Sequence, residues 1–358
     1  MPTTVKNPPE PRAAIGRMHP YEWEPPSARI ARQAGVPEDQ VVRFDTNTFP
    51  WPGARLESLP PEPLNEYPDT SYGTLTEAIA QYADVPTDRI TVGAGADEIL
   101  DLVAKAYIDA PARVVISPPT YPMFRILTEM AGGTIDEVGA IDLRLDRTTF
   151  RERAKSARLT WLCNPNNPTG ELLPVEYVAE VAMATAGVLV VDEAYFETSG
   201  VTALALIDQM PNVVIVRTLS KAFGLAGVRV GYGLAGPAIS EMLRRVRPPG
   251  SISVVSAALG AQALSDLKGM QERVRQIIEE RARLRAGLQA LGFEVRDSTA
   301  NFLLVHAGRS AAPVLLQKGL VVRTFPAASP MANYIRVTVR RPEENDRLLA
   351  ALGVAPTV

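Results

Sequence analysis

The 358-residue sequence is poor in cysteine and histidine, with a single cysteine, Cys163, and two histidines. A lone cysteine cannot form an internal disulfide, and the absence of clustered Cys and His residues argues against a zinc site. We therefore expect no metal. Cys163 lies at the end of an apolar run, where a buried thiol is ordinary, and a chain with so little cysteine suits a reducing cytoplasm.

The sequence also has no stretch of about 18 apolar residues, and its N-terminus lacks the apolar segment of a signal peptide. These absences predict a protein that neither crosses a membrane nor is exported. A large excess of charge of one sign is missing as well, since the formal net charge is −3 and acidic and basic residues are interspersed. Without a strong field to attract nucleic acid or an acidic membrane, we expect a small-molecule partner.

The chain is nevertheless long and apolar enough to bury a large core, with 46% hydrophobic residues. At roughly 150 residues per domain, the length predicts about two domains. Residues 1–45 are rich in proline, which forbids a continuous helix and favours an extended arm that packs with the small domain or a partner subunit. We expect a large domain over residues 46–247 and a small domain over residues 248–358.

Short, continuously apolar runs alternate with helical patterns from about residue 74 onward. A continuous run indicates burial on both faces of a strand, which is typical of parallel strands covered by helices. The pattern therefore predicts a doubly wound α/β sheet. The predicted strands are residues 113–117, 159–163, 187–192, 213–217 and 228–233, with helices over residues 99–107 and 176–185.

The pattern changes after Pro248 and Pro249. Charged residues at helical spacing follow, and then short apolar runs. This mixture predicts a separate α+β unit. Its expected elements are a long helix near residues 270–291, strands at residues 301–305, 320–323 and 334–339, and a terminal helix.

Polar side chains directly follow the apolar runs, at the edge of a parallel sheet where ligands bind. Asp192 ends the run 187–192, and a buried carboxylate there needs a cationic partner. The protonated ring nitrogen of a cofactor, Mg²⁺ or a structural arginine would each satisfy it. Lys221 follows the next run, among small and apolar neighbours that favour loss of its proton and formation of a Schiff base.

Three further segments add candidate ligand contacts. Ser220 and Arg229, near the lysine, offer donors to a phosphate. The loop 164–170 is made rigid by proline and presents asparagine amides. Residues 93–98 place small residues before a helix, which leaves backbone N–H groups free for an anion, although Asp97 could equally be an ordinary N-cap.

Six short strings of the chain occur in the order of the motifs of one known family. They are Tyr67-Pro-Asp69, Gly95-Ala-Asp-Glu98, Pro118-Pro-Thr-Tyr121, Asn164-Pro-Asn-Asn-Pro-Thr-Gly170, Asp192-Glu-Ala-Tyr195 and Ser220-Lys-Ala-Phe-Gly-Leu-Ala-Gly-Val-Arg229. Together they closely resemble the fold-type-I pyridoxal-phosphate aminotransferases, and most nearly the histidinol-phosphate aminotransferases. The resemblance extends from about residue 45 to residue 350. It implies a large domain with a mainly parallel seven-stranded sheet, a smaller α+β domain, pyridoxal 5'-phosphate as cofactor and a homodimer.

The resemblance also implies a role for each matching residue around the cofactor's ring. Lys221 would be the Schiff-base lysine and the proton shuttle, and Asp192 would bind the pyridine nitrogen. Asn167 and Tyr195 would contact the phenolic oxygen, while Tyr121 would stack on the ring. These residues form the expected catalytic centre.

Contacts to the phosphate and the substrate follow from the same resemblance. Arg336 matches the arginine that grips the substrate's carboxylate or phosphate, and Tyr67 would reach across from the second subunit. Further candidates for substrate contact are Tyr21, Asn47 and Arg323. The residues implied around the cofactor's phosphate are Ala96, Asp97, Ser220 and Arg229.

We predict a transaminase that uses glutamate and 2-oxoglutarate as one substrate pair and histidinol phosphate and imidazole acetol phosphate as the other. Two alternatives stay open. At residues 46–51 the chain departs from the family's Asn-Glu-Asn-Pro string, since it keeps Asn47, lacks the acidic residue and adds Phe49 and Trp51. These aromatics suit an aromatic amino-acid aminotransferase. A pyridoxal-phosphate decarboxylase of a phosphorylated amino acid shares most of the strings, and the sequence does not separate it from a transaminase.

Overall fold

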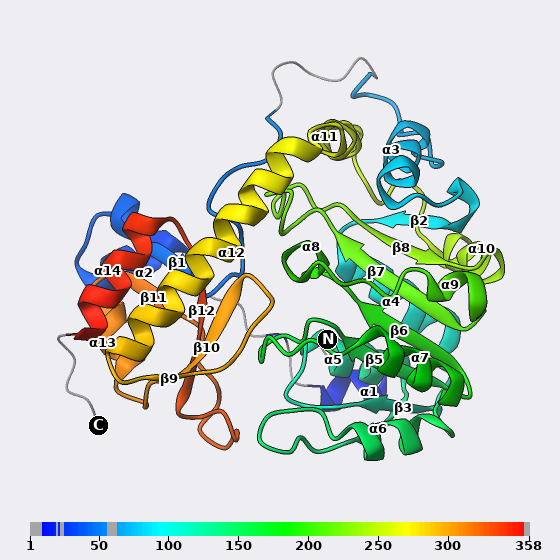
Figure 1. Ribbon diagram of the computed structural model, residues 1–358. Coiled ribbons are helices and arrows are strands. Elements are labelled where there is room, and N and C mark those ends of the chain that lie inside the picture. Colours follow the sequence, from blue (N-terminus) through cyan, green and yellow to red (C-terminus); the bar gives the residue numbers. More distant parts are fainter. Residues whose placement is uncertain (1–8, 19–20, 22–24, 56–62, 354–358) are drawn as a thin grey trace, which may run out of the picture.

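The computed structural model describes residues 9–18, 21, 25–55 and 63–353. The other residues of the predicted arm lie outside these ranges. Figure 1 shows two parts of unequal size, a larger part built on a twisted sheet and a smaller part, with the long helix α12 (Leu267–Ala290) running from one to the other. In the described part of the chain, no helix combines the length and apolarity needed to span a membrane.

The larger part contains a seven-stranded sheet in the order β2-β8-β7-β6-β5-β3-β4. Strands β3 to β7 are parallel, whereas β8 is antiparallel to both of its neighbours. The predicted mainly parallel, seven-stranded α/β sheet is therefore confirmed. Its strands are β2 Ile90–Gly93, β3 Arg113–Ile116, β4 Thr134–Glu137, β5 Leu159–Cys163, β6 Val188–Asp192, β7 Val213–Thr218 and β8 Gly231–Ala235.

Both faces of this sheet are buried, which explains the continuously apolar runs. In β6, Val188 and Val190 pack into one hydrophobic cluster, whereas Leu189 and Val191 pack into another. Successive side chains of a strand point to opposite faces, so helices must cover both. The helices of this part are α3 Gly73–Ala83, a 3₁₀ turn Thr87–Arg89, α4 Ala96–Tyr107, α5 Met123–Ala131, α6 Arg147–Ala154, α7 Val175–Ala184, α8 Phe196–Ser199, α9 Leu206–Gln209, α10 Pro237–Val246 and α11 Val254–Ser265.

Three strands differ from the sequence prediction. The pattern does not predict β2 or β4, which are the edge strands of the sheet and only four residues long. β4 is partly exposed along its length, so it lacks a continuous apolar run. β8 begins at Gly231, later than the start of the predicted strand 228–233, because Arg229 has a φ of 57° that a strand does not tolerate.

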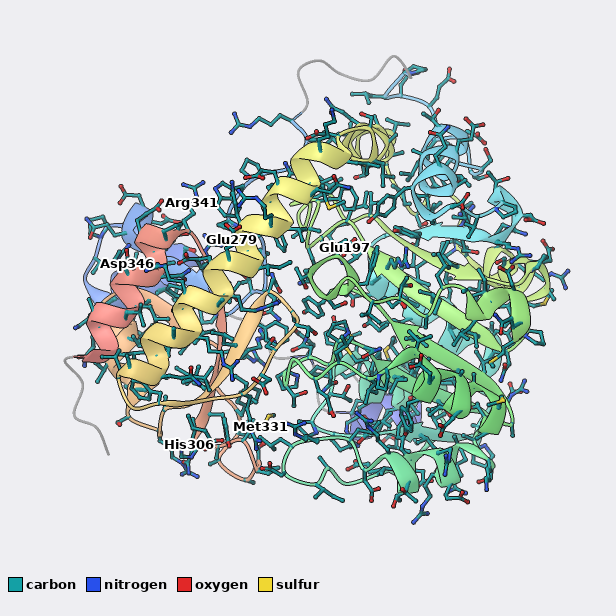
Figure 2. The ribbon with its side chains drawn as sticks, in the orientation of Figure 1. Glu197, Glu279, His306, Met331, Arg341 and Asp346 are labelled. Atoms are coloured by element: carbon teal, nitrogen blue, oxygen red, sulfur yellow. The ribbon has the colours of Figure 1, made fainter. Side chains whose placement is uncertain are left out.

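The smaller part is α+β. It holds an antiparallel sheet in the order β12-β10-β9 and a parallel pair of strands, β1 and β11. Its helices α12 and α14 carry charged side chains on their exposed faces, such as Glu279 and Asp346 in Figure 2. The elements are β1 Val42–Phe44, β9 Glu294–Val295, β10 Phe302–His306, α13 Ala311–Gln317, β11 Leu320–Val322, β12 Tyr334–Thr338 and α14 Pro342–Gly353.

The predicted domain boundary at residue 248 stays a prediction, and the segment after it contacts both parts. Helix α11 packs against α3 of the larger part, whereas α12 packs against α14 of the smaller part. His306 ends β10 and is exposed, with its ring centre 4.9 Å from that of Tyr334 (Figure 2).

The described residues of the predicted arm are not simply extended. They include α1 (Ala13–Arg17), which packs against α5, and α2 (Ser27–Ala34), which packs against α13 and a 3₁₀ turn at Glu38–Gln40. The expectation of extended segments is wrong here because Pro25 and Pro26 precede α2 instead of interrupting it. Proline is compatible with the start of a helix, where its missing N–H has no helical partner to lose.

Candidate active site

The carboxyl ends of three neighbouring parallel strands bring the predicted residues together. β5, β6 and β7 lie side by side, with Asp192 of β6 between Cys163 of β5 and Val216 of β7 in register. The loops after these strands therefore meet at one edge of the sheet, where ligands bind in folds of this kind. The amine nitrogen of Lys221 lies 5.5 Å from the centre of the Tyr195 ring.

Asp192 is a buried carboxylate that forms no ion pair with a described residue. The residue is 3% exposed, and its carboxylate accepts a hydrogen bond from the Ala194 backbone N–H at 3.0 Å. Burial raises the pKa of Asp192 to about 7, because the ionised form is poorly solvated. The described residues provide neither an ion pair for it nor a cluster of three metal-binding side chains. Of the three partners considered for Asp192, the structural arginine is thus not found here.

The side chain of Lys221 is perturbed in the opposite sense. Its pKa is lowered to about 8, first because burial disfavours the charged form and then because Arg336 adds positive charge. Asp97 and Asp192 act against this shift. A substantial fraction of the amine is therefore neutral at mildly basic pH, and the neutral amine is the form that attacks a carbonyl carbon.

A second group of polar atoms surrounds the start of α4. Gly95 precedes this helix at a φ of 82° and provides no side-chain cap, so backbone N–H groups of the first turn stay available. The Arg229 guanidinium reaches the same place, 3.2 Å from the Asp97 carboxylate and 3.4 Å from the Ser220 hydroxyl. Backbone N–H groups, a hydroxyl and a guanidinium together form a suitable cradle for a phosphate.

Asp97 is not the N-cap of α4. Its carboxylate instead accepts a hydrogen bond from the Tyr121 hydroxyl at 2.7 Å. Burial and the neighbouring Asp97 charge raise the pKa of Tyr121 well above its ordinary value, so the phenol stays protonated as a donor. Ala96, the first residue of the helix, lies so close to β8 that a Cβ at Gly231 would collide with its backbone nitrogen.

Arg336 joins the two parts of the molecule at the site. It is 9% exposed, and it donates to the Asn167 side-chain oxygen at 2.7 Å and to the Asp45 carbonyl oxygen at 2.5 Å. Its buried Nε has no hydrogen-bond partner among the described residues. An unused buried donor is unfavourable, and an anion in the site would satisfy it.

Asn47 positions the hydroxyl of Tyr195. The Asn47 side-chain amide donates to that hydroxyl at 3.0 Å, while its backbone is held by Thr338 at 2.9 Å and by the Asn301 amide at 3.0 Å. Asn47 adopts a φ of 52°, which asparagine tolerates better than most residues. Sequence analysis misses Thr338 and Asn301, although a polar residue inside or next to an apolar strand signals a buried hydrogen bond.

The three remaining predicted residues differ in their placement. Arg323 forms an antiparallel backbone bridge with Arg336 and contributes to its lowered pKa. Tyr21 interacts electrostatically with both Tyr121 and Arg336, so the structure brings it to the site. Tyr67 is 97% exposed and makes no part of the site within this chain, which leaves its predicted reach into a second subunit as a prediction.

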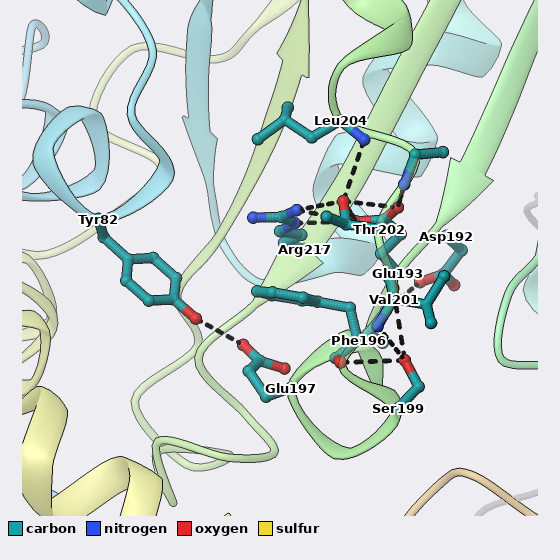
Figure 3. Close-up of polar contacts among 12 residues, drawn as sticks. Tyr82, Asp192, Glu193, Phe196, Glu197, Ser199, Val201, Thr202, Leu204 and Arg217 are labelled. Atoms are coloured by element: carbon teal, nitrogen blue, oxygen red, sulfur yellow. Dashed lines mark hydrogen bonds and ion pairs between the residues drawn. The ribbon is translucent and has the colours of Figure 1, made fainter. Parts of the chain in front are cut away.

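Sequence analysis also misses a buried ion pair behind the site, shown in Figure 3. The side chains of Arg217 and Glu193 are 3% and 1% exposed, and their charged atoms are 3.0 Å apart. The Arg217 guanidinium lies 3.7 Å above the centre of the Phe196 ring. Because Glu193 directly follows Asp192 and Phe196 directly follows Tyr195, the contacts of Arg217 with these two residues restrain the segment that carries two predicted catalytic residues. An arginine near the end of a continuous apolar run is its sequence signal.

Removal of the buried cation is expected to destabilise the fold. Arg217→Met should lower the free energy of unfolding by about 3 to 5 kcal/mol, because it leaves the Glu193 carboxylate buried without its partner. Urea unfolding followed by circular dichroism measures this loss. The control is Arg151→Met, which breaks an exposed pair with Glu180 and should lose less than about 1 kcal/mol. Equal losses in the two variants would contradict the structural importance of the buried pair.

Comparison with known proteins places this site in a family. Residues 44–352 match the profile of the family "Aminotransferase class I and II". The chain is 39% identical to a histidinol-phosphate aminotransferase of Thermococcus kodakarensis, over 83% of this chain and 85% of that one. It is 35% identical to one of Symbiobacterium thermophilum, over 96% and 98% of the two chains. A crystal structure of histidinol-phosphate aminotransferase from Sinorhizobium meliloti, in complex with pyridoxal-5'-phosphate, superimposes with a TM-score of 0.85 at 27% identity, covering 96% of each chain.

The chain belongs to the aminotransferase class I and II family, whose profile covers most of its length. Fold and family agree with the site described above, in which a lysine of lowered pKa lies near a buried aspartate. The protein is a pyridoxal-phosphate-dependent aminotransferase, and the predictions of enzyme class and cofactor are confirmed.

Proposed function

We propose that the protein transfers an amino group from histidinol phosphate to 2-oxoglutarate, giving imidazole acetol phosphate and glutamate, or runs the same exchange in reverse. The names of the relatives at 35% and 39% identity support this substrate pair. The observation that carries the proposal is Arg336, a buried arginine with an unused donor at the site. Each of these substrates carries an anionic group that such a guanidinium recognises.

The residues of the site fit pyridoxal phosphate. Asp192 is a buried carboxylate with no ion pair among the described residues, and a protonated pyridine nitrogen would supply one. The cradle at the start of α4 offers Arg229, Ser220 and backbone N–H groups to the phosphate. Lys221 has an amine that is easily deprotonated near both groups. The unsatisfied charge of Asp192 thus lies where the cofactor's own charge would balance it.

Each residue then has a definable task. Lys221 would hold the cofactor through its Nζ atom, and the same amine, when free, would carry the proton that leaves or reaches the substrate's Cα. Asp192 would keep the ring nitrogen protonated, Asn167 and Tyr195 would bind the phenolic oxygen, and Tyr121 would contact the ring. The cofactor supplies the electron sink for the charge that develops at Cα.

Recognition of the substrate falls to residues of the smaller part and the N-terminal segment. Arg336 would exchange its hydrogen bond to Asn167, now 2.7 Å, for bonds to the substrate's anionic group. Arg323 and Tyr21 lie close enough to Arg336 to interact with it electrostatically, and both would contribute to the anion site. Asn47 contributes through the Tyr195 hydroxyl that it holds in place.

The two alternative activities gain no specific support. An aromatic amino-acid substrate is suggested by Phe49, Trp51 and Trp23. Phe49 is buried in the hydrophobic core, and Trp23 lies outside the described residues. A structure of L-threonine-O-3-phosphate decarboxylase from Porphyromonas gingivalis superimposes with a TM-score of 0.69, but at 23% identity it shares the fold alone. Transamination of histidinol phosphate therefore has the better support.

A homodimer in the cytoplasm completes the proposal. Tyr67 is almost fully exposed, as expected of a side chain that would act in the site of a second copy of the chain. The single cysteine, Cys163, is buried and free, which suits a compartment where thiols remain reduced. Sedimentation equilibrium of the purified protein tests the dimer directly.

Half-reactions test the proposed substrates. The cofactor-loaded enzyme is mixed separately with histidinol phosphate, glutamate and phenylalanine, and loss of the visible absorbance of the lysine-linked cofactor is followed. We expect fast conversion with the first two donors and a kcat/KM at least 100-fold lower with phenylalanine. A preference for phenylalanine, or release of carbon dioxide without a keto product, would overturn the proposal.

Attachment of the cofactor should depend on pH. Because the pKa of Lys221 is lowered to about 8, only about one tenth of the amine is neutral at pH 7 and about half at pH 8. The rate of reconstitution of the ligand-free enzyme with pyridoxal phosphate should therefore rise between pH 6 and 8 and level off above about pH 8.5. Stopped-flow absorbance measures this rate. A continued rise to pH 10, the behaviour of an unperturbed lysine, would contradict the perturbed pKa.

A further inference from the structure

A cavity of about 460 Å³ lies between the larger and the smaller part, apart from the active site. Its walls come from the loop before α6, the end of the loop after β5, helix α12 and the segment that follows β9, elements that Figure 1 shows on both sides of the junction. None of the residues assigned to the cofactor or the substrate lines this cavity. It is therefore a separate feature of the molecule.

The lining of the cavity is basic, with five arginines and three carboxylates. Two of these arginines already have acidic partners, since Arg285 pairs with Asp297 at 2.5 Å and Arg296 pairs with Asp142. The third carboxylate, Glu171, accepts a hydrogen bond from a backbone N–H group at 3.1 Å. The cavity thus keeps positive charge that its own acidic residues do not neutralise.

Arg144, Arg147 and Arg281 carry this excess charge, since none of the three forms an ion pair with a described residue. The guanidinium of Arg147 lies 5.5 Å from the centre of the Tyr177 ring, so Arg144 and Arg281 are the stronger candidates for contact with an anion. One N–H group of Arg281 donates to the Ala300 carbonyl oxygen at 2.7 Å, and a guanidinium has five such donors. Partial burial lowers the pKa of Arg281, with no carboxylate to offset the effect. A charge withdrawn from water without a counter-ion is unfavourable, and a bound anion would relieve it.

The wall that helix α12 contributes to the cavity also has an apolar surface. Ile278, Arg281, Ala282 and Arg285 line it from α12, at the spacing of one helical face. Ile278 is 39% exposed, which is high for a large apolar side chain. Guanidinium groups beside apolar surface suit a ligand that has both an anionic group and a carbon skeleton.

We propose that this cavity is a second ligand site, which binds a small organic phosphate. Arg281 and Arg144 contact the phosphate, which guanidinium groups can bind in a bidentate manner, and Ile278 packs against the carbon skeleton. The volume lies within the range of pockets for small molecules. The site does not depend on the identity of the amino donor or acceptor.

Its position gives the site a means of influencing catalysis. In the cavity wall the Thr299 backbone N–H donates to the Gly170 carbonyl oxygen at 3.1 Å, which joins the smaller part to the loop that carries Asn167. A ligand that bridges the same walls strengthens this junction. Since Asn167 is bonded across the junction to Arg336, occupancy would alter how readily Arg336 is released to the substrate.

Calorimetric titration of the cofactor-loaded enzyme with glycerol 3-phosphate tests the proposal. This probe has a phosphate and a carbon skeleton but no amino group to react. We expect saturable binding at one site per chain, weakened roughly tenfold by Arg281→Gln and by Arg144→Gln. Arg275→Gln is the matched control, because Arg275 lies exposed on α12 and pairs with Glu272 at 2.7 Å. It should change the affinity less than twofold.

The outcomes separate this site from the active site. In both cavity variants, the cofactor's absorbance and the KM for histidinol phosphate measured without the probe should stay unchanged. Arg144 is exposed, so its variant tests the site even if Arg281→Gln fails to fold. Absence of binding, or equal affinity in the wild type and the Arg144 variant, would overturn the proposal. Calorimetry requires no turnover, so a wrong substrate assignment leaves this result intact.

Discussion

Replacement of Lys221 by alanine is expected to lower the rate of transamination by at least about 10⁴-fold. Two functions are lost together, because the same amine attaches the cofactor and moves the proton at the substrate's Cα. Burial lowers the pKa of Lys221 to about 8, so the neutral amine that both functions need is much more abundant than in an ordinary lysine. Single-turnover kinetics with histidinol phosphate measure the loss.

The cofactor itself should remain in the Lys221→Ala variant but without covalent attachment. The phosphate cradle at the start of α4 is unchanged, so pyridoxal phosphate should bind and then be removed by dialysis, whereas in the wild type it stays attached. Lys105→Ala is the control, since Lys105 is half exposed and pairs with Asp101 at 2.5 Å. Activity within tenfold of the wild type in the Lys221 variant would show that another group does the chemistry.

Asp192→Asn should reduce kcat by roughly 10³-fold, the scale of a well-placed electrostatic contact in a site. The amide has the shape of the carboxylate but no charge, so it does not keep the ring nitrogen protonated.

The same variant should stabilise the ligand-free protein at pH 8. Burial raises the pKa of Asp192 from its ordinary value of 3.8 to about 7, so stability falls as the pH rises from about 4 to 7 and the buried group ionises.

A loss of activity together with a gain of stability in Asp192→Asn would distinguish a role in cofactor binding from a purely structural role of Asp192. Thermal unfolding of ligand-free wild type and Asp192→Asn at pH 8 and pH 5 should show a higher Tm for the variant at pH 8 and a smaller difference at pH 5. Asp208→Asn is the control, because Asp208 is exposed and pairs with Arg89 on the surface. A lower Tm together with unchanged kcat would assign Asp192 a structural role only.

Much of the site is predictable from the sequence because its chemistry requires particular side chains directly after buried strands. The runs that form β5, β6 and β7 are apolar on both faces, and their ends locate Asn167, Asp192 and Lys221 near one another. Only the parallel arrangement of the strands is needed for that inference. Edge strand β4 is not predicted, because a partly exposed strand has no continuous apolar run.

Contacts between the two parts are beyond sequence reasoning. The Arg336 to Asn167 hydrogen bond joins residues 169 positions apart, and it depends on how the smaller part packs on the larger one. The buried pair of Arg217 and Glu193 likewise requires knowledge of which faces of β6 and β7 point the same way. Tyr67 illustrates a different limit, because a role in a second copy of the chain is not a property of one chain.

The pairing of β1 with β11 constrains the order in which the protein is completed on the ribosome. Val42 is among the first structured residues to be synthesised, yet its strand partner, Leu320, is among the last. Phe44, fully buried in the finished core, must wait for most of the polypeptide to be made before its neighbours exist. The seven strands of the large sheet are all complete by residue 235, long before that. All strands of the large sheet are therefore available to the nascent chain early, whereas the contacts of Arg336 with Asp45 and Asn167 become possible only near the end of translation.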